Sequence, residues 1–325
     1  MKQDTLRIIF MGTPDFAVAS LEALLAGRHQ VVGVVTMPDK AIGRHHDVLQ
    51  ASPVKECALK HGIPVLQPEK LRDEDFLAQL RSLQADLQVV VAFRMLPEVV
   101  WAMPRFGTFN VHAALLPQYR GAAPINWAVI NGETVTGVTT FFLDHDIDTG
   151  RIITQREFPI PDDADVEYVY DGLMHLGAEI CKDTVDMVLT TDGNVPSQPQ
   201  DDTKELHHAP KIFKETCEIK WDSNAKQIYD FVRGLSPYPG VWTTLAPIDA
   251  ADGAASVLKV YGTAKTEQSC GQAAPGTLRT EHGRLFVATA DKWLEITQLQ
   301  AAGKKRMAAR DFLNGFKAVE KFVVK

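Results

Sequence analysis

Three side chains in this sequence could together carry acyl-transfer chemistry. Asn110 and His112 stand two positions apart, and Asp148 follows in an Asp-Ile-Asp-Thr-Gly segment. An amide can donate a hydrogen bond to a developing oxyanion, an imidazole can shuttle a proton, and a carboxylate can orient the imidazole and raise its basicity. A satisfied polar core is the usual interpretation of a single buried histidine. The combination instead favours a catalytic site that moves an acyl group onto an amine.

The sequence offers little support for a covalent nucleophile. It contains no Gly-x-Ser-x-Gly motif, and no cysteine lies near His112 in the chain. The four cysteines lack Cys-x-x-Cys spacing and are therefore expected to be reduced thiols rather than disulfides or a zinc site. We expect a bend permitted by Gly107 and Pro117 to bring the Asn110 and His112 side chains together.

The first half of the chain alternates apolar strands with amphipathic helices. Thr13 is expected to cap a helix in which Pro14 takes the first position. This alternation predicts an α/β fold with a Rossmann-like, doubly wound parallel sheet, whose ligands bind outside the carboxyl ends of the strands. The expected strands are 7–11, 31–36, 87–92 and 109–112, and the expected helices include 53–61 and 73–83.

The second half changes character. Segments 136–143 and 152–159 are expected to pair as strands around the Asp148 turn, followed by a long helix at 166–189. Short β-prone runs then predict a small C-terminal β-barrel, similar to an OB fold. The predicted barrel strands are 241–245, 256–261, 276–279, 285–288 and 293–299. We therefore predict a catalytic domain at 1–189, a linker at 190–206 and a β-barrel domain at 207–325.

Composition places the chain among soluble globular proteins. It has 325 residues, of which 45% are hydrophobic and 23% charged. No apolar run is long enough to span a membrane, and the N-terminus does not have the pattern of a signal peptide. We expect a cytoplasmic monomer.

Charge is divided unevenly along the sequence. The net charge is −7, but residues 207–325 hold 17 Lys and Arg against 12 Asp and Glu, whereas residues 1–206 hold 17 against 29. This asymmetry favours an acidic catalytic part joined to an anion-binding part. A basic surface without a partner is the alternative.

Two further motifs carry information about ligands. The turn Gly12–Phe16 lacks the Gly-x-Gly-x-x-Gly fingerprint, and Pro14 removes an N–H donor, so an NAD enzyme is not expected. In the polar loop Met37–Ser52, Lys40 and Arg44 could contact phosphates. His45 and His46 are adjacent and no third ligand is evident, so no metal is expected.

The motifs around the three candidate residues resemble those of the folate-dependent formyltransferase family. The resemblance begins with Asn-Val-His-Ala-Ala-Leu-Leu-Pro at 110–117 and continues through Arg-Gly-Ala-Ala-Pro at 120–124 to the Gly137–Gly150 segment. Segments 12–16, 52–55 and 299–307, together with the second domain, resemble the members that act on aminoacylated tRNA. The resemblance covers nearly the whole chain.

This resemblance implies a reaction and a set of site residues. The expected donor is 10-formyltetrahydrofolate, with no metal, and the expected acceptor is the α-amine of initiator methionyl-tRNA, for translation initiation. Asn110 and His112 would stabilise the oxyanion while Asp148 orients His112. The folate is expected to contact Phe93, Arg94, Met95, Leu96, Pro97, Leu115, Leu116, Pro117, Asp144 and Asp146. The acceptor substrate is expected to contact Phe16, Lys40, Arg44, Arg120, Lys211, Arg233, Lys304, Lys305 and Arg306.

The sequence departs from the family pattern at a few positions. Ala114 stands where the family often has Ser, and His45-His46-Asp47 replaces expected glycine and lysine residues. A sugar-nucleotide N-formyltransferase with the same donor is the nearest alternative function. The pattern also leaves open a formyl-folate hydrolase and a non-catalytic RNA-binding protein.

Overall fold

The computed structural model describes residues 4–42, 48–249 and 253–325. The chain divides into two compact units. Unit 1 comprises Met1–Pro124, Val135–Pro159 and Tyr170–His208, and unit 2 comprises Ile125–Thr134, Ile160–Val169 and Ala209–Lys325. The segment predicted as a linker, 190–206, therefore lies in unit 1. The functional boundaries at 189 and 207 stay a prediction.

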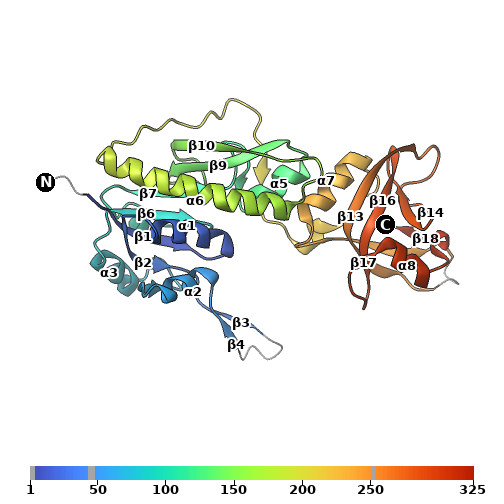
Figure 1. The fold of residues 1–325 in the computed structure, drawn as a ribbon, viewed down its shortest axis with the longest axis horizontal. Coiled ribbons are helices and arrows are strands. Elements are labelled where there is room, and N and C mark those ends of the chain that lie inside the picture. The colour runs from blue at the N-terminus through green and yellow to red at the C-terminus, as the bar shows by residue number, and fades with distance from the viewer. Residues whose placement is uncertain (1–3, 43–47, 250–252) are drawn as a thin grey trace. The chain divides into compact units, whose positions relative to one another are not determined.

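Unit 1 is built on a seven-stranded sheet in the order β10-β9-β7-β6-β1-β2-β5 (Figure 1). The strands from β7 to β5 are parallel, whereas β9 pairs antiparallel with β7 and β10 antiparallel with β9. The predicted Rossmann-like parallel sheet is thereby confirmed. The strand bounds are β1 Arg7–Gly12, β2 Gln30–Val35, β5 Val65–Leu66, β6 Leu87–Val91, β7 Thr108–His112, β9 Val135–Phe142 and β10 Ile152–Pro159.

Local sequence signals explain several of the helix starts. The Ser52 hydroxyl accepts from the Lys55 amide at the start of α2, and the Asp73 carboxylate accepts from two amides at the start of α3. The prediction that Thr13 caps α1 was wrong, because Pro14 is the N-cap residue and makes no side-chain cap. Thr13 Oγ1 instead accepts from the Met37 amide at 3.4 Å. The α-helix bounds outside the barrel are α1 Asp15–Leu25, α2 Pro53–Lys60, α3 Glu74–Ser82, α4 Glu98–Trp101, α5 Pro124–Ile130 and α6 Val166–Thr190.

Short elements connect these strands and helices. The loop predicted at 37–52 contains a two-stranded pair, β3 Lys40–Ile42 and β4 Val48–Gln50. Two further short strands are β8 Arg120–Gly121 and β11 His208–Ala209. None of the helices in the described part of the chain is long and apolar enough to cross a bilayer.

Unit 2 contains the predicted antiparallel barrel. Its sheet runs in the order β14-β15-β16-β13-β12-β18, and a bridge between Thr277 and Val323 nearly closes it. Helix α7 was not among the predicted elements, although Asn224 and Gln227 form a capping box at its start. The bounds are η1 Lys214–Cys217, α7 Ala225–Leu235, β12 Val241–Pro247, β13 Ser256–Ser269, β14 Leu278–Glu281, β15 Arg284–Ala288, β16 Lys292–Ala301, β17 Met307–Ala308, α8 Ala309–Gly315, η3 Val319–Lys321 and β18 Phe322–Val324.

Candidate active site

Strand β7 carries Asn110 and His112 at the carboxyl end of the parallel part of the sheet. Residues two apart in a strand point to the same face, so the two side chains need no bend to come together. The bend expected at Gly107 and Pro117 is therefore not what joins them. His112 is 5% exposed, and its backbone pairs with Thr139 of β9.

The His112 ring is oriented by a backbone carbonyl. Its Nε2 atom lies 2.9 Å from the carbonyl oxygen of Tyr119. Because a carbonyl can only accept, Nε2 carries the hydrogen of this bond. The Nδ1 atom therefore faces the other way, and it lies 3.9 Å from Oδ2 of Asp148. This spacing exceeds a hydrogen bond and leaves both groups able to contact a third molecule.

Asp148 sits in a turn with an unusual backbone conformation. Its φ is 57°, in the left-handed region that non-glycine residues seldom adopt. Its Oδ2 atom accepts a 3.0 Å hydrogen bond from the Gly121 amide. Gly150 closes the turn, and a Cβ there would lie 1.7 Å from the Phe142 carbonyl oxygen. The turn therefore requires glycine at position 150.

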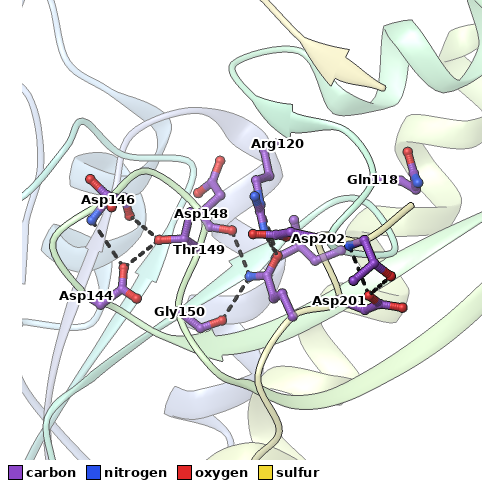
Figure 2. A network of polar contacts seen from close by, with 12 residues as sticks. Gln118, Arg120, Asp144, Asp146, Asp148, Thr149, Gly150, Asp201 and Asp202 are labelled. Carbon is purple, nitrogen blue, oxygen red and sulfur yellow. Dashed lines mark hydrogen bonds and ion pairs between the residues drawn. The ribbon is translucent and has the colours of Figure 1, made fainter. Parts of the chain in front are cut away.

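The first part of this turn is held by side chains. Oδ1 of Asp144 accepts from the Asp146 amide at 3.2 Å and from the Thr149 hydroxyl at 2.8 Å (Figure 2). Asp144 thus organises the backbone that leads to Asp148. The Asp146 side chain is exposed.

The Asn110 amide has spare hydrogen-bonding capacity. Its Oδ1 atom is buried, and none of the described residues forms a hydrogen bond with it. Buried polar atoms are normally paired, so this atom indicates a ligand contact. The side chains of Asn110, His112 and Asp148 are an amide, an imidazole and a carboxylate, which can bind a polar group of a substrate.

A hydrogen-bond network that was not predicted from the sequence supports the backbone of the Asp148 turn. Gln200 donates to the carbonyl oxygens of Asp148 and Gly150, and Arg120 donates to the Gln200 side chain. Figure 2 shows Arg120 and Asp202 beside the turn. Gln200 lies in the polar segment predicted as a linker, where no local pattern marks it.

Known sequences similar to this chain decide its family. A family model described as formyl transferase matches residues 6–185, and one described as formyl transferase, C-terminal domain matches residues 211–317. The chain is 58% identical over 329 residues to the methionyl-tRNA formyltransferase of Parabacteroides distasonis, with 100% of both chains covered. The chain belongs to the methionyl-tRNA formyltransferase family. The family resemblance predicted from the sequence is confirmed.

A second relative supports the same family, and a solved structure shows the same fold. The methionyl-tRNA formyltransferase of Phocaeicola vulgatus is 58% identical over 322 residues, with 98% of each chain covered. The solved structure of WlaRD, a sugar 3N-formyl transferase with dTDP and 5-N-formyl-THF, gives a TM-score of 0.64. That match covers 92% of this chain and 99% of WlaRD at 19% identity, which shows the fold alone.

The residues expected at the folate rim have different surroundings. Leu96 packs in the core around Val90 and Val100, and Met95 is 66% exposed. Arg94 donates to the carbonyl of Glu69 at 2.8 Å, and burial lowers the pKa of its guanidinium. Phe93 and Pro97 are half-buried.

The Leu115–Pro117 segment follows β7 in the chain and packs against β9. Leu116 is buried with Phe141 and Ile152, and its amide donates to Thr139 at 3.1 Å. A Cβ on Gly137 would lie 2.5 Å from Leu115, so this glycine leaves room for the leucine.

The acceptor residues expected in unit 1 differ in exposure. Phe16 is buried and meets Tyr170 edge-on at 5.3 Å between ring centroids. Lys40 is exposed on β3. Arg44, like His45 and His46, lies outside the described residues.

Lys55 and Gln67 anchor the base of the β3–β4 pair through Asp39. Lys55 Nζ lies 2.6 Å from Oδ2 of Asp39, and Gln67 Nε2 lies 2.7 Å from Oδ1. These hydrogen bonds lower the pKa of the Asp39 carboxyl, and the bond from Lys55 has the larger effect. Among the residues that the structure describes, no group of three or more His, Cys, Asp or Glu is placed to hold a metal ion.

Most of the cations expected at the acceptor in unit 2 are exposed. Lys211, Lys304, Lys305 and Arg306 are all exposed, and Arg306 lies over the Tyr261 ring at 4.6 Å. Arg233 is the exception, because it is 7% exposed. It bonds to Asp230 at 2.8 Å and to the Ala164 carbonyl at 2.8 Å. These partners give Arg233 a structural role and argue against a direct substrate contact.

Proposed function

We propose that this protein transfers the formyl group of 10-formyltetrahydrofolate to the α-amine of initiator methionyl-tRNA. The product is N-formylmethionyl-tRNA, which starts translation. The proposal is supported by two observations in a chain of this family: Asn110 and His112 lie on the same face of β7, and Nδ1 of His112 lies 3.9 Å from Oδ2 of Asp148. Formyltransferases of this family use a tetrahydrofolate derivative as donor.

Asn110 and His112 stabilise the charge that develops during transfer. Attack of the unprotonated amine on the formyl carbon turns the carbonyl oxygen into an oxyanion. Asn110 donates to that oxygen from its amide nitrogen, and protonated His112 donates from Nδ1 because Nε2 is occupied by Tyr119. Each lost donor at such a site raises the barrier by roughly 2.7–4 kcal/mol.

Asp148 balances the charge of the imidazolium and handles the proton that must move. The amine nitrogen forms a bond to the formyl carbon and loses one proton. The bond between the formyl carbon and N10 of the folate breaks, and N10 gains one proton. We assign to Asp148, 3.9 Å from the His112 ring, the transfer of this proton from the amine to N10, directly or through water. The reaction needs no covalent bond to the protein.

Unit 2 supplies the surface for the nucleic acid. A tRNA acceptor stem requires cations for its phosphates, and Lys211, Lys304, Lys305 and Arg306 are exposed there. We assign Lys40 and Arg44 to the same partner. The catalytic region is assigned to 1–189, the linker to 190–206 and the tRNA-binding region to 207–325.

The folate occupies the surface next to the catalytic residues. The proposed contacts are Phe93–Pro97, Leu115–Pro117 and the Asp144–Asp146 part of the turn. We propose a cytoplasmic location for the protein, as expected from its sequence. We propose a monomer, because the three catalytic groups come from a single chain; sedimentation equilibrium would test this.

The test offers several acceptors to one donor. The purified protein is incubated with 10-formyltetrahydrofolate labelled in the formyl group and with initiator methionyl-tRNA, uncharged tRNA, an amino-sugar nucleotide or buffer alone. We expect label only on the methionyl-tRNA. Label on the amino sugar would establish the alternative function, and free labelled formate in buffer would indicate a hydrolase.

A further inference from the structure

Gln200 contacts the catalytic turn through both hydrogens of its amide. Its Nε2 atom donates to the carbonyl oxygen of Asp148 at 2.8 Å and to that of Gly150 at 2.9 Å. These contacts span 50 or more positions of sequence and join a half-buried residue to the turn. The two carbonyls flank the segment that presents the Asp148 carboxylate.

Arg120 fixes which way the Gln200 amide points. Its Nε and Nη2 atoms lie 3.0 and 2.6 Å from Oε1 of Gln200. Since arginine only donates, Oε1 must face Arg120 and the NH2 group must face the turn. Asp202 accepts from Arg120 at 2.6 Å, and the Arg120 side chain is only 13% exposed. The orientation of the amide is thus set by charge and does not depend on solvent.

The turn needs such a support. Asp148 has a φ of 57°, a conformation that persists only where surrounding contacts determine it. Its carboxylate must stay aligned with the Gly121 amide and with Nδ1 of His112. Small displacements of a reacting group reduce rate strongly, even when the group itself is intact.

We propose that Gln200 is a positioning residue for formyl transfer, which acts by holding the Asp148 turn while Arg120 orients its amide. This inference rests on the proposed function and names a further residue of the same site. Gln200 acts through Asp148 and the turn backbone. Its loss should therefore lower kcat and leave the KM for methionyl-tRNA and for the folate nearly unchanged.

Two substitutions remove the donor in different ways. Gln200→Met keeps the length of the side chain without a donor, and Gln200→Glu places a carboxylate against two carbonyl oxygens while keeping its contact with Arg120. We expect both to lower kcat about tenfold or more, since two hydrogen bonds are lost. Gln200→Glu should be impaired at least as much as Gln200→Met, because the carboxylate repels the carbonyls.

Gln118, two residues before Arg120, provides a matched control. Its Nε2 donates to the Glu205 carbonyl at 3.0 Å and its Oε1 accepts from the His207 amide at 2.8 Å. Gln118→Glu therefore removes a similar side-chain anchor without touching the Asp148 turn. We expect the kcat of Gln118→Glu to stay within about twofold of wild type, although its melting temperature should fall about as much as those of the Gln200 variants.

The experiment measures steady-state kcat and KM for wild type, Gln200→Met, Gln200→Glu and Gln118→Glu, with thermal melts of each. A wild-type protein that does not formylate methionyl-tRNA would contradict the proposed function. With an active wild type, the Gln200 role is overturned if Gln200→Met keeps wild-type kcat, or if KM rises while kcat holds. It is also overturned if Gln118→Glu lowers kcat as much as the Gln200 variants do.

Discussion

His112 donates from Nε2 to the Tyr119 carbonyl at 2.9 Å, and this bond turns Nδ1 of the ring toward Asp148, 3.9 Å away. A backbone group, rather than the carboxylate, therefore fixes the orientation of the histidine ring. The 3.9 Å distance is too long for a hydrogen bond, so a substrate group beside the pair can contact both side chains. Substitutions in either group, or in the turn that holds Asp148, should therefore lower activity.

Removing the imidazole or the carboxylate should slow chemistry without weakening tRNA binding. We expect His112→Ala and Asp148→Asn to lower kcat by about 10² to 10³ or more, because each removes charge stabilisation in the transition state. Single-turnover rates and tRNA filter binding would measure the two effects separately. The control is Asp192→Asn, an exposed carboxylate paired with Arg105 at 2.9 Å. Retained activity in His112→Ala would contradict the catalytic assignment.

The Asp148 turn should not tolerate a side chain at position 150. A Cβ there would lie 1.7 Å from the Phe142 carbonyl oxygen, so Gly150→Ala must displace the backbone. We expect the free energy of unfolding to fall by about 1–3 kcal/mol, together with a loss of kcat. Urea denaturation measures the first effect. Gly315→Ala is the control, since a Cβ at that position would have open space; equal effects of the two substitutions would refute the argument.

The exposed cations of the β16–β17 connection should govern the salt dependence of tRNA binding. Replacing Lys304, Lys305 and Arg306 with glutamine should weaken binding. The negative slope of log K against log salt should become shallower by up to about 0.7–0.9 per lost phosphate contact. Filter binding between about 50 and 200 mM salt measures the slope. The control removes the same charge from three exposed residues of unit 1, Lys60, Arg72 and Lys182. An unchanged slope in the unit 2 variant would exclude these cations from phosphate contacts.

Asp39 should contribute stability that depends on pH. Its pKa is held below the ordinary value of 3.8 by the hydrogen bonds from Lys55 and then Gln67. A carboxyl with a lowered folded-state pKa stabilises the fold above its unfolded pKa, and this contribution is lost as pH falls through the folded value. Lys55→Met should therefore lower the melting temperature at pH 7 relative to wild type.

The two melting curves should begin to converge as the pH falls through about 4, where the unfolded carboxyl protonates, and should meet below the lower pKa of the folded state. Lys60→Met, at an exposed position in the last turn of the same helix, is the control. A melting-temperature difference between Lys55→Met and wild type that stays constant from pH 7 to the acid range would show that the pair contributes no electrostatic stability.

Much of the fold could be predicted because it depends on local pattern. The buried strands β1 and β6 are continuous apolar runs, and Ser52 and Asp73 mark helix starts by residue type. The proposed catalytic residues could also be named, because Asn110 and His112 share one strand and Asp148 lies in a turn rich in Asp and Gly.

The remaining features depend on contacts between distant segments. Gln200 lies in a polar stretch that looks like a linker, and its partners are 50 or more positions away. Arg233 looks like a surface cation in the sequence, but Asp230 and carbonyl groups surround it. Thr13 precedes a helix and yet bonds to the Met37 amide instead of capping it. Tertiary contacts decide each of these cases, and no local periodicity reports them.

The most direct test of the catalytic geometry is a crystal structure with a stable 10-formyl analogue of the folate bound. We predict a formyl oxygen about 2.7–3.1 Å from the amide nitrogen of Asn110 and from Nδ1 of His112, with Asp148 next to the folate nitrogen. A formyl group that faces away from these three residues, or a pterin bound elsewhere on the chain, would contradict the account.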